Sequence, residues 1–336
     1  MQLSKWFTAV DAHSGGQPLR IITSGVPHLR GDTQLQRSQE FGQGCDSIRR
    51  LLMSEPRGHH GMAGCFVTQP ASGDAELGLL FMDNGGMSPM SGHGIISAVT
   101  ALIGSGQLAP GEADSAIRID TPAGLIAAYA NFEGSEVHSV SFHNVPSFVY
   151  AKDVPVALHG LEFTVDIAFG GAFYAIVEAG ELGGVRLQES ELPVLQSWGR
   201  DIKQYLEMGL NVRHPLIPEL EGIHGVVIAD STTGHMDRRY RNVTVLAGGQ
   251  FDRSPGGAGV CALMASLAGQ GKLGAEDTSY HEGIVGTQIT ARITAETTVK
   301  DYPAIVPLVT GTAYIIGFLQ FVVDPTDPLA EGFLLC

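Results

Sequence analysis

The segment Met90-Ser91-Gly92-His93-Gly94 leads directly into an apolar run at Ile95–Ile103. A second segment, Ser254-Pro255-Gly256-Gly257-Ala258-Gly259, leads in the same way into Val260–Ala268. Ser91 and Gly256 are 165 residues apart, close to half of the 336-residue chain. Both apolar runs have helical periodicity. We therefore predict two related halves, each with a glycine-rich loop at the start of a buried helix.

Short β-type runs bounded by Gly, Pro, Asn and Asp occupy much of the remaining chain. These runs are Phe66–Thr68, Ile117–Asp120, Val137–Phe142, Phe163–Ile167, Phe173–Val177, Gly225–Ile228, Val243–Leu246, Ile289–Ile293 and Ala313–Phe318. Helical periodicity is also present at Asp46–Met53 and Leu192–Glu207. The predicted fold class is α+β, rich in strands.

Composition excludes several classes of protein. The chain is 44% hydrophobic, enough for a large core, and its 336 residues favour two domains. Twenty basic and 35 acidic residues give a net charge of −15, which would repel nucleic acid. The four cysteines lack the paired spacing of a zinc site. Without a membrane-spanning apolar stretch or a signal-peptide pattern, we expect a soluble cytoplasmic protein with no membrane partner.

The two glycine-rich loops suggest a site for a small anion. The first N–H groups of a helix have no intrahelical acceptor, and the helix dipole places partial positive charge there. Two such helix ends facing each other could hold one carboxylate. The alternative is that both loops are ordinary turns before core helices. Neither loop matches a phosphate-binding motif or a dinucleotide fingerprint, so nucleotide binding is disfavoured.

Several motifs together resemble the proline racemase family along nearly the whole chain. They are Asp11-Ala12-His13-Ser14-Gly15-Gly16-Gln17-Pro18, Arg57-Gly58-His59, the Ser91 loop, Asp120-Thr121-Pro122-Ala123-Gly124, Gly170-Gly171-Ala172-Phe173-Tyr174, Asp252-Arg253-Ser254-Pro255, Ile284-Val285-Gly286-Thr287, Gly311-Thr312-Ala313-Tyr314 and Asp324-Pro325. The resemblance implies a fold like that of diaminopimelate epimerase. It predicts two similar domains, 1–125 with 303–336 and 126–302, each a curled antiparallel sheet around a central helix. The active site is expected in the cleft between them, and relatives suggest a homodimer.

The chain departs from the family at the two positions that matter most for chemistry. In the family's racemases one cysteine stands at the position of Ser91 and another at that of Gly256, one on each face of the substrate's α-carbon. This sequence has neither cysteine. Inversion is disfavoured because Gly256 has no side chain to act on the second face. Cys261 lies five residues further along, inside the apolar run, where core packing is the favoured role.

Family members lacking one cysteine include dehydratases of trans-3-hydroxy-L-proline. In that substrate the 3-hydroxyl and the α-hydrogen lie on the same ring face, so one residue can serve a syn elimination. We therefore expect a hydro-lyase that forms Δ1-pyrroline-2-carboxylate. The alternatives are a 4-hydroxyproline 2-epimerase or proline racemase, and an inactive relative that only binds an imino acid.

The resemblance also assigns roles to individual residues. Ser91 would be the acid/base, although it could simply cap its helix. His93 and Asp252 match positions that hydrogen-bond the ring amine; the alternatives are a packed core histidine and a solvated turn acid. Backbone N–H groups of Gly92, His93, Gly257 and Ala258 would bind the carboxylate, and the missing side chain at Gly256 leaves room for the substrate.

Three further histidine features are less distinctive. His13 and His224 could contact the ring hydroxyl, or each could have a purely structural role. The run Arg57-Gly58-His59-His60 has no carboxylate or cysteine at ligand spacing, so we expect no metal. We also expect no cofactor, because the α-proton of the bound zwitterion can be removed without an electron sink such as pyridoxal phosphate.

Overall fold

The computed structural model describes residues 5–109, 115–231 and 237–335. The chain divides into two compact units, which we call the first unit (1–142 with 312–336) and the second unit (143–311). These limits lie at 142 and 311, whereas the sequence placed them at 125 and 302. Among the described residues no helix combines the length and apolar character needed to cross a bilayer.

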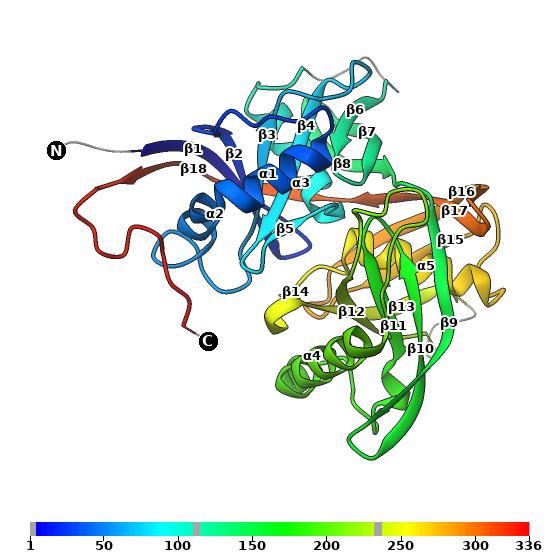
Figure 1. Cartoon of the computed structure of the whole chain (residues 1–336). Helices are drawn as coiled ribbons and strands as arrows, with labels where there is room; N and C mark the ends of the chain where they lie inside the picture. Colours follow the sequence, from blue (N-terminus) through cyan, green and yellow to red (C-terminus); the bar gives the residue numbers. More distant parts are fainter. Residues whose placement is uncertain (1–4, 110–114, 232–236, 336) are drawn as a thin grey trace. The chain divides into compact units, whose positions relative to one another are not determined.

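Strands dominate both units (Figure 1). The first unit contains β1 (Lys5–Ser14), β2 (Gln17–Ser24), β3 (Ala63–Thr68), β4 (Leu77–Asp83), β5 (Met87–Ser88), β6 (Ile117–Thr121), β7 (Gly124–Glu133), β8 (Glu136–His143) and β18 (Ala313–Val323). The second contains β9 (Ser147–Leu158), β10 (Leu161–Phe169), β11 (Phe173–Glu178), β12 (Ile223–Asp230), β13 (Arg239–Leu246), β14 (Phe251–Asp252), β15 (Thr278–Glu282), β16 (Gln288–Val299) and β17 (Tyr302–Gly311).

Helices are fewer. They are α1 (Gln34–Gly44), α2 (Asp46–Met53), α3 (Gly92–Gly104), α4 (Leu192–Gly209) and α5 (Gly257–Gly269), with short 3₁₀ turns η1 (Ala179–Glu181), η2 (Glu189–Glu191) and η4 (Ala247–Gly249). All four predicted helices and all nine predicted strands are present. The sequence missed α1, because only three of its residues are buried and it has no apolar stripe.

The two units share one order of strand pairing. In the first unit β1 pairs with β2 and β18, β2 with β3, β3 with β4, β4 with β5 and β6, and β6 with β7. In the second, β10 pairs with β11 and β9, β11 with β12, β12 with β13, β13 with β14 and β15, and β15 with β16. Thus β4 and α3 of the first unit correspond to β13 and α5 of the second.

The expectation of a curled antiparallel sheet in each unit was wrong, because the sheet of each unit is mixed. Among the described strands, four pairs run parallel: β2 with β3 and β4 with β6 in the first unit, and β11 with β12 and β13 with β15 in the second. Parallel neighbours need a crossover connection, usually through a helix. The four crossovers contain α1 and α2, α3, α4, and α5, respectively. The helices that carry the glycine-rich loops are therefore crossover helices.

Helices α3 and α5 each contain 13 residues and are buried along almost their whole length. Helix α3 packs against β1, β2 and β18, whereas α5 packs against β9, β10, β11 and β17 (Figure 1). Such all-round burial explains why both sequences are apolar on every side. Gly170 permits the close approach to α5, because a Cβ there would lie 2.3 Å from the Ala258 carbonyl oxygen.

Some of the motifs that carry the family resemblance have a structural role. The Asp11 carboxylate forms a two-point ion pair with Arg20, at 2.9 and 2.8 Å, and Arg20 also donates to the carbonyl oxygens of Leu52 and Arg57. Asp120 accepts hydrogen bonds from the backbone N–H groups of Ala71 and Ser72. These aspartates hold strands and loops of the first unit together.

Candidate functional site

The N-terminus of α3 is capped by Ser91, whose backbone is extended there. Its Oγ accepts a hydrogen bond from Gly94 N at 3.2 Å, and its carbonyl accepts the first intrahelical bond, from Ile95 N, at 2.9 Å. The amides of Gly92 and His93 precede that bond and have no acceptor within the helix. Capping by Ser91 is therefore established, and it aims these two amides out of the helix end.

The side chain of His93 lies beside the Ser91 hydroxyl. Ser91 Oγ is 3.3 Å from His93 Nε2 and 3.4 Å from Nδ1, and both residues are half-buried. Because Oγ is almost equally far from the two ring nitrogens, neither contact has the alignment of a strong hydrogen bond. His93 is thus close enough to influence Ser91, but a modest rotation of its ring is needed before one nitrogen can accept the Ser91 proton directly.

In the second unit, Asp252 anchors the loop that leads into α5. This residue is only 6% exposed, and its Oδ1 accepts bonds from Ser254 N at 3.0 Å and Ser254 Oγ at 2.6 Å. Ser254 Oγ in turn accepts a bond from Gly256 N at 3.0 Å. The carboxylate is therefore held through Oδ1, and its orientation is fixed.

Gly256 occupies the N-cap position of α5 with φ 83°, in the left-handed region where residues with a Cβ are strained. A Cβ built on Gly256 would lie 3.3 Å from both Asp252 Oδ2 and Thr244 Oγ1. These two oxygens therefore border the space in which a side chain at position 256 would begin. The α5 end differs from the α3 end, where Ser91 supplies a hydroxyl.

The two less distinctive histidines lie on strands. His13 in β1 accepts a bond from Gly16 N at 3.4 Å, and its ring is 5.4 Å from that of Tyr314. The structure does not place it in contact with Ser91. His224 in β12 packs edge-on against Tyr174, with ring centroids 5.7 Å apart. Their proposed contacts with a ring hydroxyl remain predictions.

Cys261 is fully buried in α5. Burial raises the pKa of its thiol, so the thiolate is strongly disfavoured, and the nearby Asn144 side chain only partly offsets this effect. The residue is thus poorly suited to act as a base, in agreement with the core role that its sequence position favoured.

Two residues around the α5 end were missed by sequence reasoning. Ser254 could have been found, because a serine two residues after an aspartate commonly closes such a turn. Thr244 could not, since it reaches Gly256 only through strand pairing of β13 with β14. Ser91, Gly92 and His93 lie together in the first unit, and Asp252, Gly256, Gly257 and Ala258 lie together in the second.

These features define a class of α+β protein with two units of matching strand order, each bearing a glycine-rich loop at the end of a buried crossover helix. Comparison with known proteins identifies the family within that class. The family model described as proline racemase matches residues 9–334. The chain belongs to the proline racemase family.

Individual relatives cover the whole chain. It is 50% identical over 336 residues, and 100% of both chains, to a trans-3-hydroxy-L-proline dehydratase from Bacillus thuringiensis subsp. konkukian. It is 38% identical, over 99% of both chains, to a proline racemase from Acetoanaerobium sticklandii. It also resembles the crystal structure of a hydroxyproline epimerase from Agrobacterium vitis with bound trans-4-hydroxy-L-proline, with a TM-score of 0.95, 29% identity, and coverage of 100% of this chain and 96% of that one.

Proposed function

We propose that this protein is an enzyme that dehydrates trans-3-hydroxy-L-proline to Δ1-pyrroline-2-carboxylate. The observation that carries the proposal is the asymmetry of the two helix ends, since α3 begins with the Ser91 hydroxyl and α5 begins with Gly256. An elimination that uses one face of the substrate needs only the first. The relative at 50% identity is named for this reaction. We place the enzyme in the cytoplasm.

In the proposed mechanism the substrate lies between the two helix ends, in a cleft between two domains of the kind found in diaminopimelate epimerase. Amides at the start of α3 and α5 bind the carboxylate and stabilise the charge that develops on it as the α-proton leaves. Ser91 takes the α-proton and returns a proton to the departing 3-hydroxyl, which leaves as water. The reacting groups required are supplied by the chain and the substrate.

Asp252 and His93 hold the ring nitrogen in this proposal. A protonated nitrogen acidifies the neighbouring α-hydrogen, and the Asp252 carboxylate supplies the countercharge. The bonds from Ser254 to Oδ1 keep that carboxylate from rotating away. His93 lies within 3.4 Å of Ser91 Oγ through either ring nitrogen, so a modest rotation of its ring lets one nitrogen also accept the Ser91 proton. In this proposal His13 and His224 contact the 3-hydroxyl of the substrate.

The direct test is to incubate the protein with trans-3-hydroxy-L-proline and to detect the cyclic imine with 2-aminobenzaldehyde or an imine reductase. We expect imine formation. Parallel samples with L-proline and trans-4-hydroxy-L-proline should be followed by optical rotation and by α-deuterium incorporation. Inversion of those substrates without imine formation would identify a racemase or epimerase, whereas tight binding of pyrrole-2-carboxylate without turnover would identify an inactive relative.

Capture of the carboxylate predicts a large effect of Gly257→Val. A branched side chain at the first residue of α5 would stand between the amides and the ligand, so the affinity for pyrrole-2-carboxylate should fall by at least about tenfold, or 1.4 kcal/mol. Calorimetric titration measures this affinity. Gly180→Val is the control, because a Cβ at this exposed glycine meets nothing within 4 Å. Equal affinities for both variants would rule out capture by α5.

We further propose a homodimer formed through the outer face of β18. On this face Tyr314, Ile316 at 62%, Phe318 at 70% and Val322 are exposed, with Gln320 the one polar residue among them, and Trp6 of β1 lies opposite Val322 at the far end. Contiguous exposed apolar surface of this kind is typical of interaction sites. Phe318→Glu should therefore give monomers in sedimentation at micromolar concentration, whereas Leu125→Glu, at an exposed apolar position on β7, should leave the dimer intact. A monomeric wild type would refute the proposal.

A further inference from the structure

One row of buried polar side chains in the second unit has no counterpart in the first. Tyr240, Asn242 and Thr244 alternate along β13 and therefore share one face of the sheet. That face points toward α5, because a Cβ on Gly259 would lie 2.9 Å from Thr244 Oγ1. His281 of β15 is the pairing partner of Tyr240, with ring centroids 5.4 Å apart. None of the four is more than 2% exposed.

The corresponding row in the first unit is entirely apolar. Phe81 of β4 pairs with β5 in the same way that Thr244 of β13 pairs with β14. A Cβ on Gly94 of α3 would meet Phe81, just as a Cβ on Gly259 of α5 would meet Thr244. Leu77 pairs with Ile119 as Tyr240 pairs with His281. Leu79 lies between Leu77 and Phe81, in the place of Asn242. The same architecture is thus stable with an apolar row, so folding does not require the polar one.

Each of the four polar residues has an atom without a hydrogen-bond partner in the part of the chain that the structure describes. These atoms are Thr244 Oγ1, Asn242 Oδ1, Tyr240 Oη and His281 Nδ1. Buried polar groups in proteins are almost always paired with protein or with internal water. A single such atom would carry little meaning. Four such atoms on one face of the sheet form a row of polar groups that internal water could satisfy.

Hydrogen-bond accounting shows which atoms need a donor. Ser279 Oγ donates to the Ala291 carbonyl at 3.1 Å, so it accepts from His281 Nε2 at 2.9 Å. Burial lowers the pKa of His281 to about 3, so the ring is neutral and its Nδ1 is an acceptor. Asn242 Nδ2 donates to the Pro255 carbonyl, which leaves Oδ1 as a second acceptor. Water is the ligand that donates to such acceptors and accepts from the hydroxyls.

The spacing of the row suits a chain of water molecules. Alternate residues on a strand are about 6.6 Å apart, which is more than a single water with two hydrogen bonds of about 2.8 Å can span, so two waters in series link each neighbouring pair. At one end Thr244 Oγ1 borders Gly256 and Asp252. Glu178 of β11 pairs with Ala229 of β12, and Ala229 pairs with Asn242 of β13, so Glu178 lies on the same face of the sheet as the row. Glu178 is held by Ser231, which donates to it through both N and Oγ.

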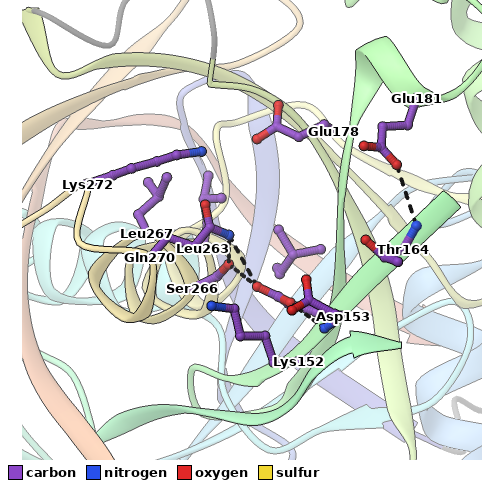
Figure 2. A pocket seen from close by; sticks show the side chains of 12 residues that line it. Lys152, Asp153, Thr164, Glu178, Glu181, Leu263, Ser266, Leu267, Gln270 and Lys272 are labelled. Atoms are coloured by element: carbon purple, nitrogen blue, oxygen red, sulfur yellow. Dashed lines mark hydrogen bonds between the residues drawn. The ribbon is translucent and has the colours of Figure 1, made fainter. Parts of the chain in front are cut away.

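Glu178 also lines a cavity of about 290 Å³ beside the C-terminal part of α5 (Figure 2). The cavity wall includes Lys152, Lys272 and Ser266, and it is open enough to admit solvent. Glu178 is thus the link between this cavity and the polar row, and the Thr244 end of the row borders Gly256, the N-cap of α5.

We propose that Thr244, Asn242 and Tyr240 hold a file of internal water molecules that delivers a proton from the Glu178 cavity to the Gly256 side of the substrate. This inference rests on the proposed dehydration. Loss of water leaves an enamine with a C2=C3 bond. The π pair of that bond takes the delivered proton at C3, the nitrogen lone pair forms the C=N bond, and the N–H proton is then released. One proton is taken up and one is lost, so the step balances.

The test uses trans-3-hydroxy-L-proline in D₂O with excess imine reductase, which traps the imine as L-proline. In the wild type, NMR should find deuterium at C3 on the face opposite the one that the hydroxyl left, which is the face cis to the carboxylate. Tyr240→Phe removes only a hydroxyl group, and Thr244→Val replaces a hydroxyl group with a methyl group. In both variants deuterium should appear on both faces of C3. Thr294→Val is the control, since Thr294 Oγ1 already donates to the Val306 carbonyl.

The outcomes separate the two proposals. If the wild type forms no imine, the dehydration itself is wrong. If imine forms but deuterium is scrambled in the wild type, or stays on one face in Thr244→Val and Tyr240→Phe, the proton path is wrong. A crystal structure adds a readout that is independent of turnover: ordered waters bonded to Thr244 Oγ1 and Asn242 Oδ1 support the path, and a dry row overturns it.

Discussion

Ser91→Ala should lose most of its dehydratase activity, by about 10²- to 10⁴-fold, which is the contribution typical of a positioned acid/base. The loss is expected because, of the two N-cap residues, Ser91 of α3 has a hydroxyl that can exchange a proton, whereas Gly256 of α5 has no side chain. Initial rates of imine formation measure the effect. Cys261→Ser should keep the greater part of the activity, since burial holds that thiol protonated.

A second effect of Ser91→Ala must be separated from the first. The substitution also removes the cap on Gly94 N, which costs about 1 kcal/mol of stability. Thr33→Ala is a matched control, because Thr33 Oγ1 caps α1 through Gln36 N at 3.1 Å in the same unit. Both variants should lose similar stability, but only Ser91→Ala should lose activity. A fully active Ser91→Ala, or an inactive Cys261→Ser, would show that the base has been misplaced.

Arg20→Met should destabilise the protein by about 3–5 kcal/mol, the usual cost of leaving one partner of a buried ion pair uncompensated. Arg20 is 5% exposed and pairs with Asp11, and its guanidinium lies 4.2 Å from the centre of the Phe321 ring. The substitution leaves the Asp11 carboxylate and two backbone carbonyl oxygens without the donor that Arg20 now provides. Urea denaturation followed by circular dichroism measures the change.

Two further variants make the ion-pair prediction specific. Arg213→Met breaks a pair with Glu221 in which both side chains are more than half exposed, so it should cost less than about 1 kcal/mol. The double variant Asp11→Leu/Arg20→Met should be more stable than Arg20→Met alone, because no buried charge then lacks a partner. Equal costs for Arg20→Met and Arg213→Met would contradict the structural role of the Asp11 motif.

Much of the fold could be predicted from local pattern. The apolar runs after the two glycine-rich loops form α3 and α5, and Asp46–Met53 forms α2 with the predicted limits. Strand direction could not be predicted in the same way. Whether two strands run parallel depends on the connection between them and on which strand lies next to which, and both are properties of the assembled sheet.

The residues of the candidate site divide in the same way, into features that the local sequence predicts and features that only the structure shows. Ser91, Gly256 and Asp252 were recognisable because they lie within short motifs. The left-handed conformation of Gly256 and the capping bond of Ser91 needed the backbone. Asp11 and Asp120 lie in motifs of the same kind, yet their contacts are structural. A motif in the sequence shows that residues matter together, but not whether they hold the fold or contact a substrate.

The sequence by itself determined the strand-rich α+β class, the two glycine-rich helix ends and the replacement of both cysteines, because these depend on residues adjacent along the chain. Only the tertiary structure decided that Thr244 lies beside Gly256 and that Tyr240 and Asn242 extend this polar row. The corresponding row in the first unit is apolar. The physical reason is that these neighbours are brought together by pairing between strands and by packing on α5. Contacts between residues that are far apart along the chain produce no periodic pattern in the sequence.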